Sequence, residues 1–215
     1  MATPSLPPIS SLSTADEKTI KSVLDTLFEP CPEIHSIAVP AIQRRRRIPA
    51  NPGLTADLPS PVPSSLTIPD DAPFTSYASL VQHIGTLLHQ LTVSISPSPS
   101  ISLTVTRDKL HAILGSHPRL GSKRVDSAQS RAEQAQLNTG AQDEAERLAA
   151  LNREYEERFP GLRYVVFVNG RARDVIMEDM RRRIDRGDIR AEEREGVQAM
   201  VDIALDRAGK LGSTD

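Results

Sequence analysis

The chain has 215 residues, of which 38% are hydrophobic and 17 are prolines, so one ordinary domain with some segments outside its core is expected. A formal net charge of −2 excludes a general attraction to nucleic acid or to a membrane surface. The single cysteine, Cys31, excludes an internal disulfide, and no apolar run reaches the roughly 18 residues of a membrane span.

The ends of the sequence carry no recognisable address. The first residues lack an apolar signal core and an arginine-rich amphipathic pattern, and the last residues are not the peroxisomal Ser-Lys-Leu. We therefore expect a soluble protein of the cytoplasm or, without that C-terminal signal, of the peroxisome.

In the first third of the chain, the sequence predicts two helices and an irregular insertion. Residues 1–12 are rich in Pro and Ser and predict a disordered N-terminus, so the domain is expected to span residues 13–211. Thr14 and Glu17 match a capping box, and apolar residues then recur at helical spacing as far as Phe28. A shorter helix is expected over residues 34–42. The Pro- and Arg-rich residues 44–74 show no period and predict a surface insertion.

The middle of the chain predicts a buried helix, a loop and a short helix. Residues 76–91 place apolar side chains on one broad face. Residues 92–104 contain two Ser-Pro steps and predict a flexible loop, after which Thr106 is expected to cap a helix that Gly115 ends. His117 then precedes a proline, which excludes the helical conformation and projects its side chain from a turn.

The last third predicts four helices around the only convincing extended run, Tyr164–Val168, which Asn169 and Gly170 follow. The helices are expected at residues 127–137, 141–159, 173–186 and 191–210. The sum is an all-α, single-domain helical bundle of about seven helices, with one short extended segment near residues 164–168.

Several common sites are absent from the sequence. It contains no glycine-rich phosphate loop, no GxSxG, no CxxC and no HExxH. His83 and His89 have no carboxylate or cysteine partners at metal-ligand spacing, so no metal site is expected. An enzyme built on this sequence would work without a cofactor, through acids, bases and hydrogen bonds.

One cluster has the residue types for such chemistry. Ser130, Glu133 and Gln134 stand at i, i+3 and i+4 and share one face of a predicted helix just after His117. A carboxylate beside the imidazole would fix its tautomer and raise its pKa, and an amide can both donate to and accept from a planar ligand.

A structural interpretation of the same cluster stays open. Glu133 could instead pair with Lys123 or Arg131 on a solvated surface, while His117 packs against its own turn. The spacing of the residues does not separate the two interpretations.

A set of ordered motifs resembles a known family, that of 2-oxo-4-hydroxy-4-carboxy-5-ureidoimidazoline (OHCU) decarboxylase. The motifs are FEPCP, SHPRLG, SRAEQ, LNREYEERF, YVVFVNGR and IALDRAGKL, and they agree in order from residue 14 to residue 210, with the insertion outside the pattern. Arg119 stands where the family commonly has Asp, and the residues before Tyr164 also depart from the family pattern. The chain therefore resembles a divergent, fungal-type branch.

The resemblance implies cofactor-independent decarboxylation of this small ureidoimidazoline to (S)-allantoin in uric acid degradation. It implies that His117 is the acid/base group and that Glu133 orients it or shares its proton. The implied substrate-binding residues are Pro118, Ser130, Gln134, Phe167, Val168, Asn169 and Arg207.

Hypotheses other than decarboxylation remain open. The chain could be a catalytically inactive helical module that retains the fold for protein interaction. Binding of nucleic acid through Arg44–Arg47 and Arg181–Arg183 is a weaker idea, and no nucleic-acid or membrane partner is expected. An exposed apolar face on the last two helices could support a homodimer.

Overall fold

The structure is a computed structural model that describes residues 5–45, 72–93, 101–121, 128–134 and 142–212. These residues form nine helices and no strand, which confirms the all-α prediction and raises the number of helices from about seven. The helices are α1 (Ile9–Leu12), α2 (Glu17–Phe28), α3 (Pro32–Arg44), α4 (Tyr77–Val93), α5 (Ile101–Gly115), α6 (Ala128–Gln134), α7 (Gln142–Arg158), α8 (Arg173–Arg186) and α9 (Ile189–Leu211).

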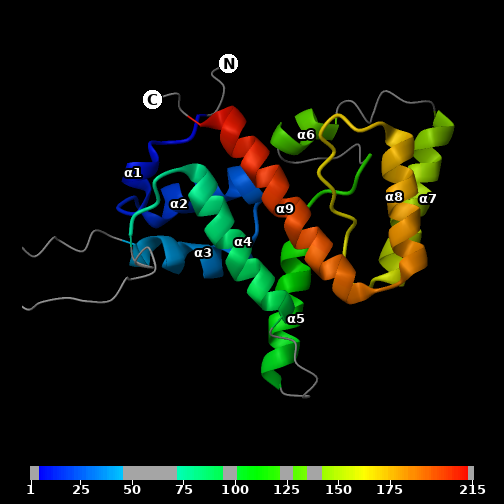
Figure 1. The fold of residues 1–215 in the computed structure, drawn as a ribbon, viewed down its shortest axis with the longest axis horizontal. Coiled ribbons are helices and arrows are strands. Elements are labelled where there is room, and N and C mark those ends of the chain that lie inside the picture. Colours follow the sequence, from blue (N-terminus) through cyan, green and yellow to red (C-terminus); the bar gives the residue numbers. More distant parts are fainter. Residues whose placement is uncertain (1–4, 46–71, 94–100, 122–127, 135–141, 213–215) are drawn as a thin grey trace, which may run out of the picture.

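Helix α9 is the centre of the packing. It runs diagonally through the molecule, with α1–α3 on one side and the paired α7 and α8 on the other (Figure 1). It packs against α4, α2 and α5. A Cβ atom added at Gly85 of α4 would lie 2.7 Å from Cγ2 of Val201, so this glycine lets α4 and α9 approach closely.

The N-terminus differs from its prediction. Residues 9–12 form α1, Leu6 and Leu12 are buried, and the amide of Leu6 donates to the carbonyl of Leu211 at 3.1 Å. The prediction of disorder is therefore wrong for residues 5–12, because two leucines in a Pro/Ser-rich segment reach the core. Residues 1–4 lie outside the described part of the chain.

Two helix starts also differ from their predictions. The N-cap of α2 is Asp16, whose carboxylate accepts from the amide of Thr19 at 2.7 Å, whereas Thr14 bonds back to Ser11. Helix α5 begins at Ile101, so the predicted loop over residues 92–104 is helical at both ends, and residues 94–100 lie outside the description. Thr106 is inside α5 and does not cap it.

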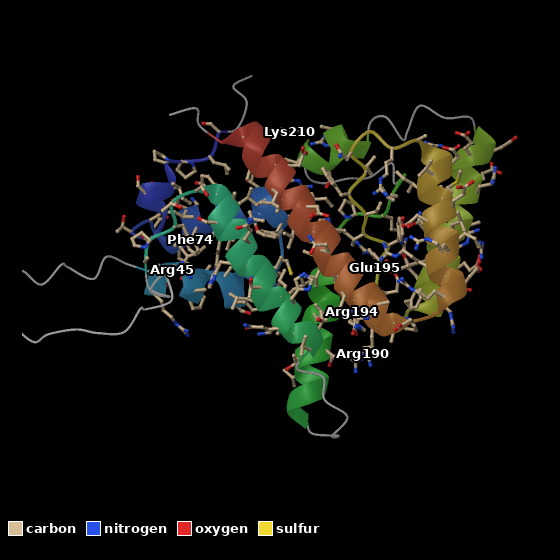
Figure 2. The ribbon with its side chains drawn as sticks, in the orientation of Figure 1. Arg45, Phe74, Arg190, Arg194, Glu195 and Lys210 are labelled. Carbon is tan, nitrogen blue, oxygen red and sulfur yellow. The ribbon has the colours of Figure 1, made fainter. Side chains whose placement is uncertain are left out.

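The predicted insertion lies largely outside the described residues, which omit 46–71. At its near edge, Arg45 donates to the carbonyl of Ala72 at 3.2 Å and stacks 4.3 Å from the ring centre of Phe74 (Figure 2). Its guanidinium also lies 3.2 Å from Nδ1 of His83. The part of the arginine run that is described is thus anchored to the domain.

Residues 162–168, which include the predicted extended segment, lie outside any helix or strand, and a buried ionic group contacts them. Arg183 donates to the carbonyl of Val165 at 3.3 Å, and its guanidinium lies 4.8 Å from the ring centre of Tyr164. The carboxylate of Glu192 accepts from Arg183 at 2.8 Å and from Tyr155 at 2.6 Å. Buried polar groups that satisfy one another in this way fix the course of the backbone beside them.

The surface of the last two helices bears on the predicted homodimer. Most apolar residues of α9 are buried within the chain, while Val175 of α8, which the helical pattern places inward, is 46% exposed. The dimer stays a prediction, without an apolar face on α9 to support it. None of the described helices is long and apolar enough to cross a membrane.

Candidate active site

A cavity of about 210 Å³ lies between the turn after α5, helix α6, the extended segment and the end of α9. Lys210, labelled at that end of α9 in Figure 2, lines it together with Asp206 and Ile203. Six of the nine residues predicted for the site also line it, namely His117, Pro118, Ser130, Phe167, Val168 and Asn169. The structure thus gathers residues that are up to 52 positions apart in the sequence (169 minus 117).

His117 forms part of the cavity wall from a turn that begins where α5 ends. The amide of Ser116 bonds to the carbonyl of Ile113, which closes the helix, and Pro118 then keeps His117 out of the helical conformation. The His117 side chain is buried, and its Nε2 has no hydrogen-bond partner among the described residues. A buried ring nitrogen left without a partner at a cavity is available to a ligand.

The surroundings of His117 keep its imidazole neutral at pH 7. Burial lowers its pKa, the positive charge of Arg207 and then that of Arg163 lower it further, and the carboxylate of Glu29 partly opposes them. The resulting pKa is about 4, against an ordinary value of 6.5. A neutral imidazole can accept a proton from a ligand and later return it.

This pKa predicts how stability depends on pH. Between pH 6.5 and 4 the unfolded chain holds a proton on His117 that the folded protein does not, so the free energy of unfolding falls as the pH falls. Between pH 7 and pH 5 this group should cost wild type about 2 kcal/mol. Urea denaturation at both pH values should show that His117→Gln loses about that much less than wild type. An equal loss in both proteins would contradict a neutral, buried His117.

Behind Ser130 lies a buried ionic cluster. The Ser130 hydroxyl donates to Oε1 of Glu29 at 2.5 Å, and Nη2 of Arg207 reaches the same oxygen at 2.7 Å and the hydroxyl at 3.0 Å. The other arm of Arg207 donates to the carbonyls of Thr26 and Leu27, each at 3.3 Å. The last turn of α2, α6 and α9 are thereby tied together directly beside the cavity.

Glu29 is a residue of this cluster that the sequence did not single out. Its φ is 75° and its ψ 151°, a region that is almost restricted to glycine, yet a carboxylate is placed there and buried. Burial raises its pKa, but Arg207 and the Ser130 hydroxyl outweigh burial and hold the pKa of Glu29 below its ordinary value. The only signal in the sequence was its position in FEPCP, directly after the predicted helix.

The remaining predicted residues are placed less fully. Glu133 and Gln134 lie in α6, as expected, but their side chains are outside the described part of the structure. The pairing of His117 with Glu133 therefore stays a prediction. Arg207 does not line the cavity and contacts it through Ser130, so its expected contact with an anionic oxygen of the ligand also stays a prediction.

The extended segment contributes its backbone to the cavity. Arg171 donates to the carbonyls of Phe167 and Val168, and the Arg171 amide also donates to Val168 at 2.8 Å. Among the described residues, no hydrogen bond engages the N–H groups of residues 166–169. Unpaired amides beside a cavity are ready donors to the carbonyl oxygens of a urea.

The family model for OHCU decarboxylase matches residues 13–209 of the chain, nearly its whole length. The chain belongs to the OHCU decarboxylase family. No curated protein matches the sequence. Membership of the OHCU decarboxylase family implies a lyase that carries out a decarboxylation in urate degradation. The order of motifs predicted this membership, and the family match confirms it.

Proposed function

We propose that the protein decarboxylates OHCU to (S)-allantoin, with His117 as its acid/base group and no cofactor. The observation that carries the proposal is the buried, neutral imidazole whose Nε2 is unpaired among the described residues, in the wall of a cavity that also offers backbone amides. Family membership supplies the reaction class, and the cavity supplies groups suited to it.

The reaction does not require a covalent bond between the protein and the substrate. The bond between the ring and the carboxylate breaks, CO₂ leaves, and the electron pair enters the adjacent C=N system of the ring, which leaves a negative charge on the ring nitrogen. One proton must then reach the ring carbon that bears the ureido group, and the hydroxyl on the decarboxylated carbon becomes a carbonyl as its own proton passes to that ring nitrogen. Orientation, charge stabilisation and proton delivery to one face are sufficient for catalysis.

The low pKa of His117 suits this sequence of events. The carboxylate of an arriving substrate places a negative charge near the imidazole and raises its pKa, so that it takes up a proton. Loss of CO₂ removes that carboxylate, and the imidazolium becomes a stronger acid beside the electron-rich ring. It can then protonate one face of the ring carbon, which would make the product (S)-allantoin rather than a racemate.

The other residues have supporting roles in this proposal. The amides of Phe167, Val168 and Asn169 donate to the ureido or ring carbonyl groups, and Pro118 shapes the wall. Ser130 offers its hydroxyl oxygen while Glu29 and Arg207 hold that side chain in place. Glu133 and Gln134 are proposed to act from the adjoining helix α6 as the family pattern implies.

The test is a direct assay of substrate decay. OHCU is generated from ¹³C-labelled urate, and its disappearance is followed by NMR with and without catalytic amounts of the protein. We expect accelerated decay with release of one labelled CO₂ per allantoin, if that carboxylate carries the label. A decay rate equal to that of the protein-free control would contradict the proposal and favour an inactive module that retains the fold.

A further inference from the structure

The turn that carries His117 is anchored at several successive residues. Nδ2 of Asn152 on α7 donates to the carbonyl of Leu120 at 3.1 Å, and Nε and Nη2 of Arg119 each donate to the carboxylate of Glu156 at 2.5 Å. Nη1 of Arg163 donates to the carbonyl of His117 at 2.9 Å. The first two contacts hold the turn against α7, and only the contact from Arg163 acts on the imidazole-bearing residue itself.

The contact from Arg163 bears on the direction of the imidazole. The His117 carbonyl belongs to the bond that precedes Pro118, whose ring restricts the backbone of both residues. Because the backbone is restricted in this way, a hydrogen bond that fixes the His117 carbonyl also fixes the direction of the Cα–Cβ bond that carries the imidazole. A buried carbonyl without a donor would be unfavourable, so the turn would shift if Arg163 were removed.

Arg163 also links two walls of the cavity. It directly precedes the extended segment, whose Tyr164 and Val165 line the cavity. One side chain therefore sets the position of His117 relative to the backbone that is proposed to hold the substrate. Misplacement of a reacting group by about 1 Å is enough to lower a rate strongly.

The charge of Arg163 acts on the same imidazole. His117 is surrounded by Arg207 from α9, Glu29 from the end of α2 and Arg163, and Asp206 and Lys210 of α9 line the same cavity, paired with each other at 2.5 Å. Arg163 is the member of this set that is both charged and bonded to the His117 backbone. Removal of Arg163 should therefore change both the position and the protonation of the His117 imidazole.

We propose that Arg163 is a positioning residue, whose guanidinium holds the His117 carbonyl so that the imidazole keeps a fixed direction relative to the extended segment. This role rests on the proposed function of His117 for its effect on catalysis. The geometric part of the proposal, that Arg163 holds His117 in place, does not depend on activity.

The experiment compares Arg163→Leu, Arg163→Gln and Arg163→Lys with Arg119→Gln, which loosens the same turn at an exposed ion pair. The first readout is NMR titration of the His117 imidazole, assigned by its loss in His117→Gln. The midpoint should rise from about 4 in Arg163→Leu and Arg163→Gln, because a positive charge is lost, and stay in place in Arg163→Lys and Arg119→Gln.

The second readout is catalysis and product chirality. Arg163→Leu should lower kcat by roughly 10- to 100-fold with little change in KM and should reduce the enantiomeric excess of allantoin. Arg163→Lys, which keeps a charged donor, should restore most of kcat. If Arg163→Leu acted only by lowering stability, Arg163→Lys would not restore both the titration midpoint of His117 and kcat.

The outcomes separate this proposal from the proposed function. If wild type does not decarboxylate OHCU, the function fails, but the titration midpoint of His117 and the proton contacts of its imidazole still test Arg163. If these match wild type in Arg163→Leu and in Arg163→Gln, Arg163 does not hold His117. If Arg163→Leu folds poorly, Arg163→Gln still decides the test.

Discussion

His117→Gln should lower the kcat of OHCU decarboxylation by roughly 10²- to 10⁴-fold while the protein stays folded at pH 7. The substitution removes the buried imidazole whose Nε2 is unpaired among the described residues, and with it the proposed proton donor. Stability at pH 7 should change little because the imidazole is already neutral there. Rates are measured with freshly generated substrate at saturating concentration, and folding is checked by urea denaturation.

His89→Gln is a matched control for this substitution. His89 lies on α4 and does not line the cavity, so the same chemical change there should leave kcat within the error of the assay. A His117→Gln protein that folds normally and retains wild-type kcat would show that the imidazole has no part in the reaction. The cavity would then need another proton donor.

Removal of either charge in the Glu29–Arg207 pair should lower the free energy of unfolding by about 3 to 5 kcal/mol. Both side chains are buried, and Arg207→Met or Glu29→Gln leaves the partner charge inside the protein without its counter-ion. A loss of this size is a large fraction of the total stability of an ordinary domain. Equilibrium urea denaturation at pH 7 measures it, and activity should fall as well because Ser130 loses its fixed partners.

The double variant separates charge imbalance from packing. Arg207→Met combined with Glu29→Gln removes both charges of the pair at once, so it should be more stable than the sum of the two single losses predicts. Its activity should stay low, since the hydroxyl of Ser130 is no longer held from both sides. Glu17→Gln, which breaks the exposed pair with Lys21, should change stability little. Strictly additive losses would contradict a buried, coupled pair.

Local patterns predicted most helices of the fold. Apolar residues at helical spacing give α2, α4, α7, α8 and α9 because burial of one face is the dominant local signal. The breaker Gly187 adopts the left-handed conformation that ends α8, as its position after the last apolar residue predicts.

Features that depend on distant partners could not be predicted. Glu29 joins the site through Ser130 and Arg207, which are 101 and 178 positions away. Leu6 is ordered through Leu211 at the opposite end of the chain. From the sequence alone, a Pro/Ser-rich segment and a carboxylate that follows a helix are both expected at the surface. Their buried partners become known only from the fold.

Competing local signals account for other misses. Thr14 and Asp16 are both good N-caps, and only the geometry of α2 selects Asp16. The two Ser-Pro steps within residues 92–104 predict a loop, yet α5 begins at Ile101, directly after them. The order of the family motifs points to His117, because its spacing to Ser130 alone favours a structural turn.

The most direct test of the proposed function is the circular dichroism of allantoin formed from urate through its unstable intermediates in the presence of the wild-type protein. We expect an excess of (S)-allantoin that grows with protein concentration and disappears with His117→Gln. Racemic allantoin at every protein concentration, formed at the rate of the protein-free reaction, would contradict it.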